Sequence, residues 1–113
     1  MSLKDRILAV RESKVPVGAH SFTIRRPSEA VQLELFGGHG RANPLELVRR
    51  CVVGWSLTEL DLFPGGSPVE APFSDDLWRE YIDDHSELWE PLSEAILLAI
   101  SEHNKKAERA VKK

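Results

Sequence analysis

The segment between residues 56 and 73 constrains the fold more than any other part of the chain. It holds Pro64, Pro68 and Pro72 together with the glycines Gly65 and Gly66. Proline lacks a backbone N–H and glycine is costly to order, so neither a helix nor a central strand runs through such a stretch. We therefore expect a Pro/Gly-rich loop over 56–73, inside one domain that spans 1–113.

Two short elements are predicted before this loop, near the N-terminus. A helix is expected within residues 1–14, because its apolar residues share one helical face and Ser2 can cap it. These apolar residues are Leu3, Ile7 and Leu8. A β-hairpin is expected over 15–26, because Val15, Val17, Phe22 and Ile24 alternate with other residues around a glycine-containing turn.

Residues 27–55 are predicted to form two helices. Residues 31–36 are ambiguous, since their alternating apolar residues suit a strand, whereas Ser28 as a cap and Gly37 as a stop suit a helix. We favour the helix. The second helix is expected to begin at Asn43-Pro44 and to continue through Trp55, because its apolar residues recur at spacings of three, four and three. They are Leu45, Val48, Val52 and Trp55.

The C-terminal part, 74–110, is predicted to hold two more helices. Ser74 followed by two acidic residues is a helix start, and Asp83 to Ser86 ends that helix. The last helix is expected from about Leu88 to Ala110, with Pro91 in its first turn. The predicted fold class is mainly α, a small single-domain helical protein with a short N-terminal β-hairpin.

The distribution of charge favours some partners over others. Residues 1–54 hold nine basic and five acidic side chains, 55–94 hold one and eleven, and 95–113 hold five and two. This pattern disfavours nucleic acid and is typical of a solvated surface or of a charged protein partner. We expect no membrane segment, because no apolar run approaches the roughly 18 residues of a span. The absence of a secretory signal and the single cysteine favour the cytoplasm.

Few residues suggest catalysis or a bound cofactor. The stretches "FPGGSP" and "FGGHGRA" lack the context of a phosphate-binding loop and are interpreted as turns. Cys51 is interpreted as a packing residue, and the four histidines show no metal-ligand spacing. We therefore predict no catalytic, cofactor-binding or metal-binding residues and no enzyme activity. A small enzyme using Cys51 or the acidic cluster is the least favoured hypothesis.

The last helix is more apolar than one buried face requires. Its stripe of Leu88, Leu92, Ile96 and Ile100 suits a core, but three further large apolar residues widen the apolar arc. They are Trp89, Leu97 and Leu98, which we take as candidate partner-binding residues. The alternatives are packing within the core, a partner surface, or self-association of the chain.

Several short motifs, in a fixed order, link this chain to a known family. A helix is followed by Val52-Val53-Gly54-Trp55, then by Gly66, Pro68 and Val69, and then by Pro72, Phe73 and Ser74. Together with the upstream "FTIRRPSEAVQLEL", this order resembles the tail assembly chaperones of long-tailed bacteriophages, over about Phe22 to Ile100. The double glycine Gly65-Gly66 and the long "SLTELDLFP" before it depart from the family pattern.

The resemblance implies a non-enzymatic protein of the bacterial host cytoplasm that binds the tape measure protein and recruits tail tube subunits. The structural motif residues are Gly54, Trp55, Pro68, Val69, Pro72, Phe73 and Ser74, and we expect Phe63 and Phe73 to attach the loop to the core. The alternative function is a small cytoplasmic regulatory adaptor that binds a host protein through the acidic middle segment.

Overall fold

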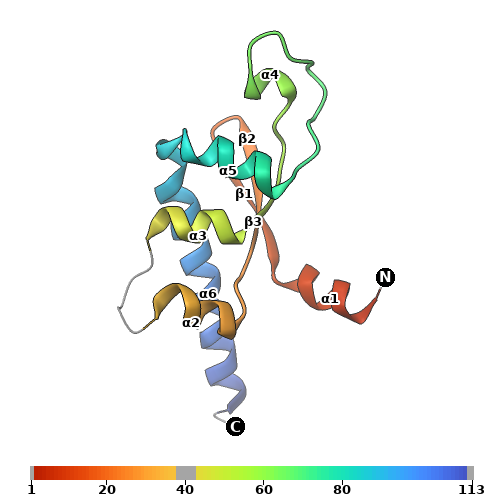
Figure 1. Ribbon diagram of the computed structural model, residues 1–113. Coiled ribbons are helices and arrows are strands. Elements are labelled where there is room, and N and C mark those ends of the chain that lie inside the picture. The colour runs from red at the N-terminus through yellow and green to blue at the C-terminus, as the bar shows by residue number, and fades with distance from the viewer. Residues whose placement is uncertain (1, 38–42, 112–113) are drawn as a thin grey trace.

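The computed structural model describes residues 2–37 and 43–111 (Figure 1). Helices surround a small three-stranded antiparallel sheet, so the mainly α fold class is confirmed. In chain order the elements are α1 (Leu3–Val10), β1 (Glu12–Val17), β2 (His20–Arg25), α2 (Glu29–Phe36), α3 (Pro44–Cys51), β3 (Val52–Trp55), α4 (Glu59–Leu62), α5 (Asp75–Asp83), the 3-10 helix η1 (Ser86–Leu88) and α6 (Trp89–Val111).

The N-terminal helix is shorter than predicted, and the hairpin starts earlier. Ser2 caps α1 as expected, but the helix ends at Val10, and residues 12–14 belong to β1. β1 and β2 pair antiparallel along their whole length. They are joined by two residues, of which only Gly18 has a positive φ, +61°. This sign pattern is that of a type II′ turn, whose twist suits a two-residue hairpin.

The third strand corrects the prediction of a helix through Trp55. α3 ends at Cys51, and β3 pairs antiparallel with the inner strand β2. Trp55 lies opposite Phe22 and Val52 lies opposite Ile24, so β3 carries one extra residue, Val53, at a bulge. The bulge lets Val52 and Trp55 both turn towards the core. Their three-residue spacing, which the sequence analysis took as helical periodicity, is therefore produced by a bulged strand.

The ambiguous residues 31–36 are helical and belong to α2. The Ser28 hydroxyl accepts a hydrogen bond from the Val31 N–H, and Gly37 adopts a left-handed conformation at the C-terminal end of the helix. Both features are the ones that favoured a helix in the sequence. Alternation at 31, 33 and 35 had suggested a strand, but the flanking cap and stop decide the local conformation.

The C-terminal helices follow the prediction closely. α5 begins after Ser74, and α6 begins at Trp89, which places Pro91 in its first turn. One short helix, α4, lies inside the segment predicted as a loop. Thr58 and Asp61 form a capping box there, a signal that the sequence contained and the prediction omitted.

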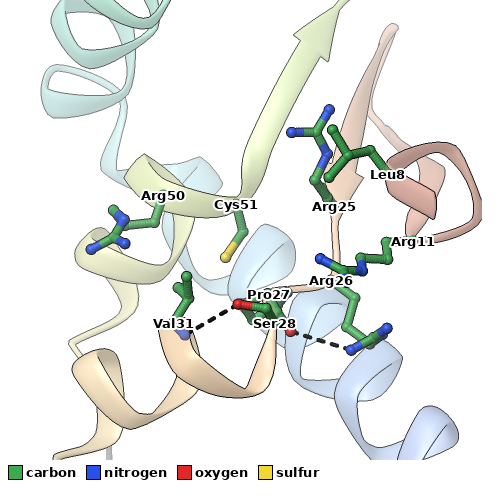
Figure 2. Close-up of a pocket in the computed structure, with 9 residues that line it drawn as sticks. All are labelled: Leu8, Arg11, Arg25, Arg26, Pro27, Ser28, Val31, Arg50 and Cys51. Carbon is green, nitrogen blue, oxygen red and sulfur yellow. Dashed lines mark hydrogen bonds between the residues drawn. The ribbon is translucent and has the colours of Figure 1, made fainter. Parts of the chain in front are cut away.

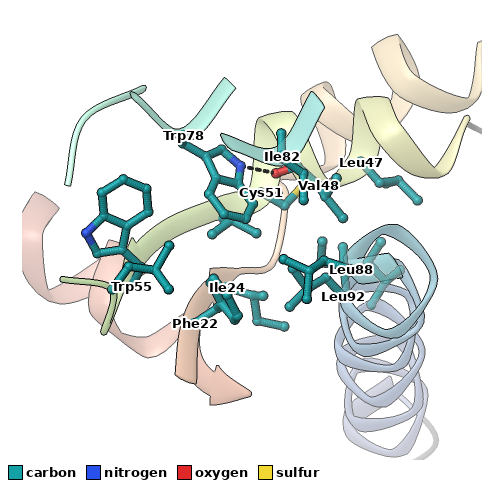
Figure 3. Packing of buried hydrophobic residues seen from close by; sticks show 14 of the residues in the cluster. Phe22, Ile24, Leu47, Val48, Cys51, Trp55, Trp78, Ile82, Leu88 and Leu92 are labelled. Carbon is teal, nitrogen blue, oxygen red and sulfur yellow. Dashed lines mark hydrogen bonds between the residues drawn. The ribbon is translucent and has the colours of Figure 1, made fainter. Parts of the chain in front are cut away.

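The core lies between the sheet and helices α3, α5 and α6 (Figure 3). Trp78 of α5 is at its centre, where its ring lies 5.6 Å from that of Phe22 and its Nε1–H donates to the Val48 carbonyl oxygen at 2.8 Å. The C-terminal part of the chain contributes apolar side chains at four-residue spacing, as predicted. They are Leu88, Leu92, Ile96 and Ile100.

Two parts of the chain stand away from this core (Figure 1). One is α1, and the other is α4 with the loop that follows it, which contacts the core through Leu62. The radius of gyration is 15.5 Å, whereas a compact domain of 100 residues has about 13 Å. The molecule therefore combines one packed body with two projecting segments.

Candidate functional site

The motif that carries the family resemblance attaches the loop to the core at both of its ends. The Trp55 Nε1–H donates to the Ala71 carbonyl oxygen at 2.7 Å, and the Phe73 ring meets the Trp55 ring edge-on at 5.2 Å. Trp55 also lies 6.3 Å from Trp78, ring centre to ring centre. The expectation that Phe73 attaches the loop to the core is confirmed, and Trp55 is the core residue that Phe73 contacts.

Gly54 has a steric role beside Trp55. It lies opposite Thr23 in the sheet, and a Cβ atom at Gly54 would lie 3.1 Å from both Cβ and Oγ1 of Thr23. That separation is closer than ordinary van der Waals contact, so the absence of a side chain lets β3 approach β2 at the bulge. The Gly-Trp pair therefore serves one purpose, which is to place the indole ring against the core.

Ser74 connects the end of the loop to α5. Its hydroxyl accepts a hydrogen bond from the Leu77 N–H at 3.2 Å, and Asp75 and Asp76 occupy the first turn, where negative charge suits the helix dipole. The helix then presents Trp78 to Trp55. Pro72 is exposed and lies between the Ala71 hydrogen bond and Phe73. This end of the motif is thus a helix start.

The middle of the loop folds back on itself. The Leu60 N–H donates to the Ser67 carbonyl oxygen at 3.0 Å, and Thr58 forms an isolated bridge with Glu70. Gly66 allows this close return, because a Cβ atom there would lie 2.5 Å from the Glu59 carbonyl group. The motif residues Pro68 and Val69 are exposed on the returning part of the loop.

Phe63 corrects the expectation that both phenylalanines attach the loop. Its side chain is 51% exposed, whereas the neighbouring Leu62 packs against the core. The physical reason is α4, which turns Leu62 towards the body and leaves Phe63 in an extended conformation at its end. A sequence interpretation that omitted α4 could not separate these two adjacent residues.

The three candidate partner-binding residues do not share one surface. Trp89 is partly buried, and its Nε1–H donates to the Ile82 carbonyl oxygen at 2.7 Å, which joins α6 to α5. Leu97 and Leu98 follow about 12 Å further along the helix and are 43% and 58% exposed. Their neighbour Ile96 is fully buried. Of the three candidates, Leu97 and Leu98 are exposed, and Trp89 is not.

Cys51 lies in the core at the end of α3. Its side chain is 2% exposed, and burial raises the pKa of its thiol to about 11, with Arg50 acting weakly in the opposite direction. A thiol in this environment stays protonated at neutral pH, and thiolate is the nucleophilic form. The interpretation of Cys51 as a packing residue is confirmed.

His85 packs against α5 and, among the described residues, shows no sign of metal binding. His85 stacks on Tyr81 with ring centres 3.9 Å apart, and its Nδ1 lies 2.7 Å from the Tyr81 carbonyl oxygen. In the described part of the chain, no three His, Cys, Asp or Glu side chains are grouped to hold a metal ion. Residues 38–42 of "FGGHGRA" lie outside the described residues.

Over 2–37 and 43–111, no helix is both long and apolar enough to cross a membrane.

Two surface hollows were not anticipated from the sequence. One, of about 290 Å³, lies between α4 and α5 and combines apolar side chains with acidic ones. It is lined by Leu62, Phe63, Leu77, Glu80, Tyr81, Asp84 and His85. The other is lined by four arginines of the basic N-terminal half.

Comparison of the chain with models of protein families, with curated proteins and with solved structures found no match.

Proposed function

We propose that this protein is a non-enzymatic tail assembly chaperone of a long-tailed bacteriophage, which binds the tape measure protein in the host cytoplasm and promotes assembly of the tail tube. The observation that carries the proposal is the exposed pair Leu97 and Leu98 on α6. The order of the motifs from Gly54 to Ser74 supports it through the family resemblance.

The exposed leucines suit a helical partner. α6 is 23 residues long, and its buried side packs on α3 and β2, which holds the helix rigid. Burying a fully exposed leucine contributes roughly 1.5–3 kcal/mol, and these two are about half exposed, so a partner gains about half of that from each. An apolar helix face laid against two adjacent leucines is a common mode of recognition. Tape measure proteins, as the resemblance implies, are the partner.

A co-expression pulldown tests this function. The tagged tape measure protein from the same phage is expressed with the wild-type chain, with the double variant Leu97→Gln, Leu98→Gln, and with Leu33→Gln as a matched control. Leu33 lies on α2 and is 75% exposed. We expect the wild type and the control to form the complex equally and the double variant to bind about tenfold more weakly. No complex with the wild type contradicts the function, whereas equal binding by the double variant contradicts only the surface.

The second candidate is the small regulatory adaptor. The observation that favours it is the acidic hollow between α4 and α5, where apolar Phe63 and Leu77 lie beside Glu80 and Asp84. Such a hollow suits an apolar segment that carries basic residues. Tail tube and tape measure genes on either side of this gene favour the chaperone, and an isolated gene favours the adaptor.

A further inference from the structure

A pocket of about 220 Å³ lies where α1, β2, α2 and α3 meet (Figure 2). Four arginines are among its lining residues: Arg11, Arg25 and Arg26 lie on the side of α1 and β2, and Arg50 lies at the end of α3, with its side chain directed away from Cys51. The backbone holds two of them together, because the Arg26 N–H donates to the Arg11 carbonyl oxygen at 2.9 Å. Four arginines from three separate stretches of the sequence thus line one small pocket.

Two of these arginines are paired with carboxylates, and two are not. Arg25 contacts Glu12 at 2.7 Å, and Arg50 contacts Glu34 at 2.9 Å. Within the described residues, no carboxylate oxygen lies within 4.0 Å of a guanidinium nitrogen of Arg11 or Arg26. The Arg26 side chain instead donates to the Pro27 carbonyl oxygen at 3.3 Å. The pocket therefore has two cations available to a ligand.

The two available arginines also repel each other. Burial lowers the pKa of Arg26, repulsion from Arg11 lowers it further, and Glu29 acts in the opposite direction. An anion between the two guanidinium groups relieves this repulsion. Guanidinium groups bind planar oxyanions through two parallel N–H donors, which gives direction as well as attraction.

The rest of the lining indicates an organic anion. Leu8, Val31 and Pro27 form apolar walls, and Cys51 contributes its protonated thiol. A space of about 220 Å³ lies below the roughly 300–1,000 Å³ of ligand pockets. It therefore fits one side chain better than a nucleotide or a cofactor.

The surrounding acids favour a single negative charge. Glu12 and Glu34 neutralise two of the four arginines, and Glu29 lies near enough to Arg26 to raise its pKa. A doubly charged phosphate would meet these carboxylates, and a nucleic acid would also meet the acidic middle of the chain. A monoanionic carboxylate balances the remaining positive charge.

We propose that this pocket binds the carboxylate of an acidic residue, flanked by apolar side chains, in a partner polypeptide, with Arg11 and Arg26 as its ion-pair partners. The site goes beyond the proposed function, because it uses neither Leu97 nor Leu98 and holds for any partner with this chemistry. Leu8 and Val31 contact the apolar side chains next to the carboxylate.

An NMR titration tests the proposal on the full-length protein. The probe is acetyl-Leu-Glu-Leu-amide, and the matched control probe is acetyl-Leu-Gln-Leu-amide, which differs only in the charge. We expect the glutamate probe to shift the side-chain Nε–Hε signals of Arg11 and Arg26 and to leave that of Arg79 unchanged. Arg79 is exposed on α5, away from the pocket lining. Inorganic phosphate is titrated separately and should bind more weakly than the glutamate probe.

Variants then assign the ligand contacts. Arg11→Gln and Arg26→Gln should each weaken binding of the glutamate probe about tenfold, whereas Arg79→Gln, with the same change in net charge, should leave it unchanged. If either pocket variant fails to fold, the wild-type shifts decide the question alone. No binding of the glutamate probe, equal binding of the glutamine probe, or tighter binding of phosphate overturns the proposal.

Discussion

α1 and α3 are helices of the same length with well-formed starts, yet they differ completely in burial. Each has eight residues; Ser2 and Asp5 form a capping box on α1, and the Asn43 side chain caps α3 beside Pro44. α3 buries Leu47, Val48 and Cys51, whereas α1 buries no residue. Both helices thus have the local sequence signals that start a helix, but only α3 has the packing that stabilises one.

The difference teaches that capping places a helix without making it stable. An isolated helix of eight residues is marginal in water, because nucleation is unfavourable and few hydrogen bonds follow it. α3 overcomes this through contacts with α5 and α6. α1 buries none of its residues, and Leu3 and Val10 are 76% and 82% exposed. We therefore expect α1 to open locally while α3 opens only with the whole domain.

The largest expected effect comes from matched leucine truncations in the two helices. Leu47→Ala should lower the free energy of unfolding by about 2–5 kcal/mol, because Leu47 is 2% exposed and its loss leaves a cavity. Leu3→Ala should change it by less than about 0.5 kcal/mol. Urea denaturation followed by tryptophan fluorescence measures both. Similar losses in the two variants would show that α1 is packed in solution, contrary to the comparison.

The next effect concerns the last residue of α3. Burial raises the pKa of the Cys51 thiol from 9.0 to about 11. Between these two pH values the unfolded chain releases the thiol proton and the folded chain keeps it, so the unfolding free energy falls as pH rises. The slope approaches about 1.4 kcal/mol per pH unit between the two values and fades towards zero as pH falls below 9. Denaturation of the wild type and of Cys51→Ala across this range gives the difference.

A cysteine moved to α1 is the control for this measurement. Ala9 is exposed, so the thiol of Ala9→Cys in the Cys51→Ala background should titrate near the unshifted pKa of 9.0 and react quickly with a thiol reagent at pH 8. Cys51 in the wild type should react slowly until the protein unfolds. The account of Cys51 fails if the stability difference between wild type and Cys51→Ala is flat from pH 9 to 11.

Local signals in the sequence were sufficient for most helices and insufficient for the third strand. Ser28, Asn43 and Ser74 each cap the helix predicted to follow them. β3 was missed because the bulge at Val53 reproduces the three-residue spacing of a helix face. Only pairing with β2, a contact about thirty residues away in the chain, distinguishes the two, and no local pattern encodes that contact.

The two candidate surfaces also differ in whether a local sequence pattern predicts them. Leu97 and Leu98 could be predicted from helical periodicity, because α6 is a regular helix that holds more large apolar residues than one buried face requires. The arginine pocket could not be selected in this way. Arg11, Arg26 and Arg50 come from separate segments of the chain, and only the packing of α1, β2, α2 and α3 places them around one pocket.

The smallest expected effect comes from removing the two helix caps. Asn43→Ala should lower the free energy of unfolding by about 1 kcal/mol, because the Asn43 side chain accepts from the Leu45 N–H at 2.8 Å and α3 unfolds with the core. Ser2→Ala removes a comparable bond to the Asp5 N–H, yet it should leave global stability unchanged. Its effect should appear only as faster amide hydrogen exchange within α1. If Ser2→Ala instead lowers global stability as much as Asn43→Ala, α1 unfolds together with the core, and its exposed face is covered in solution.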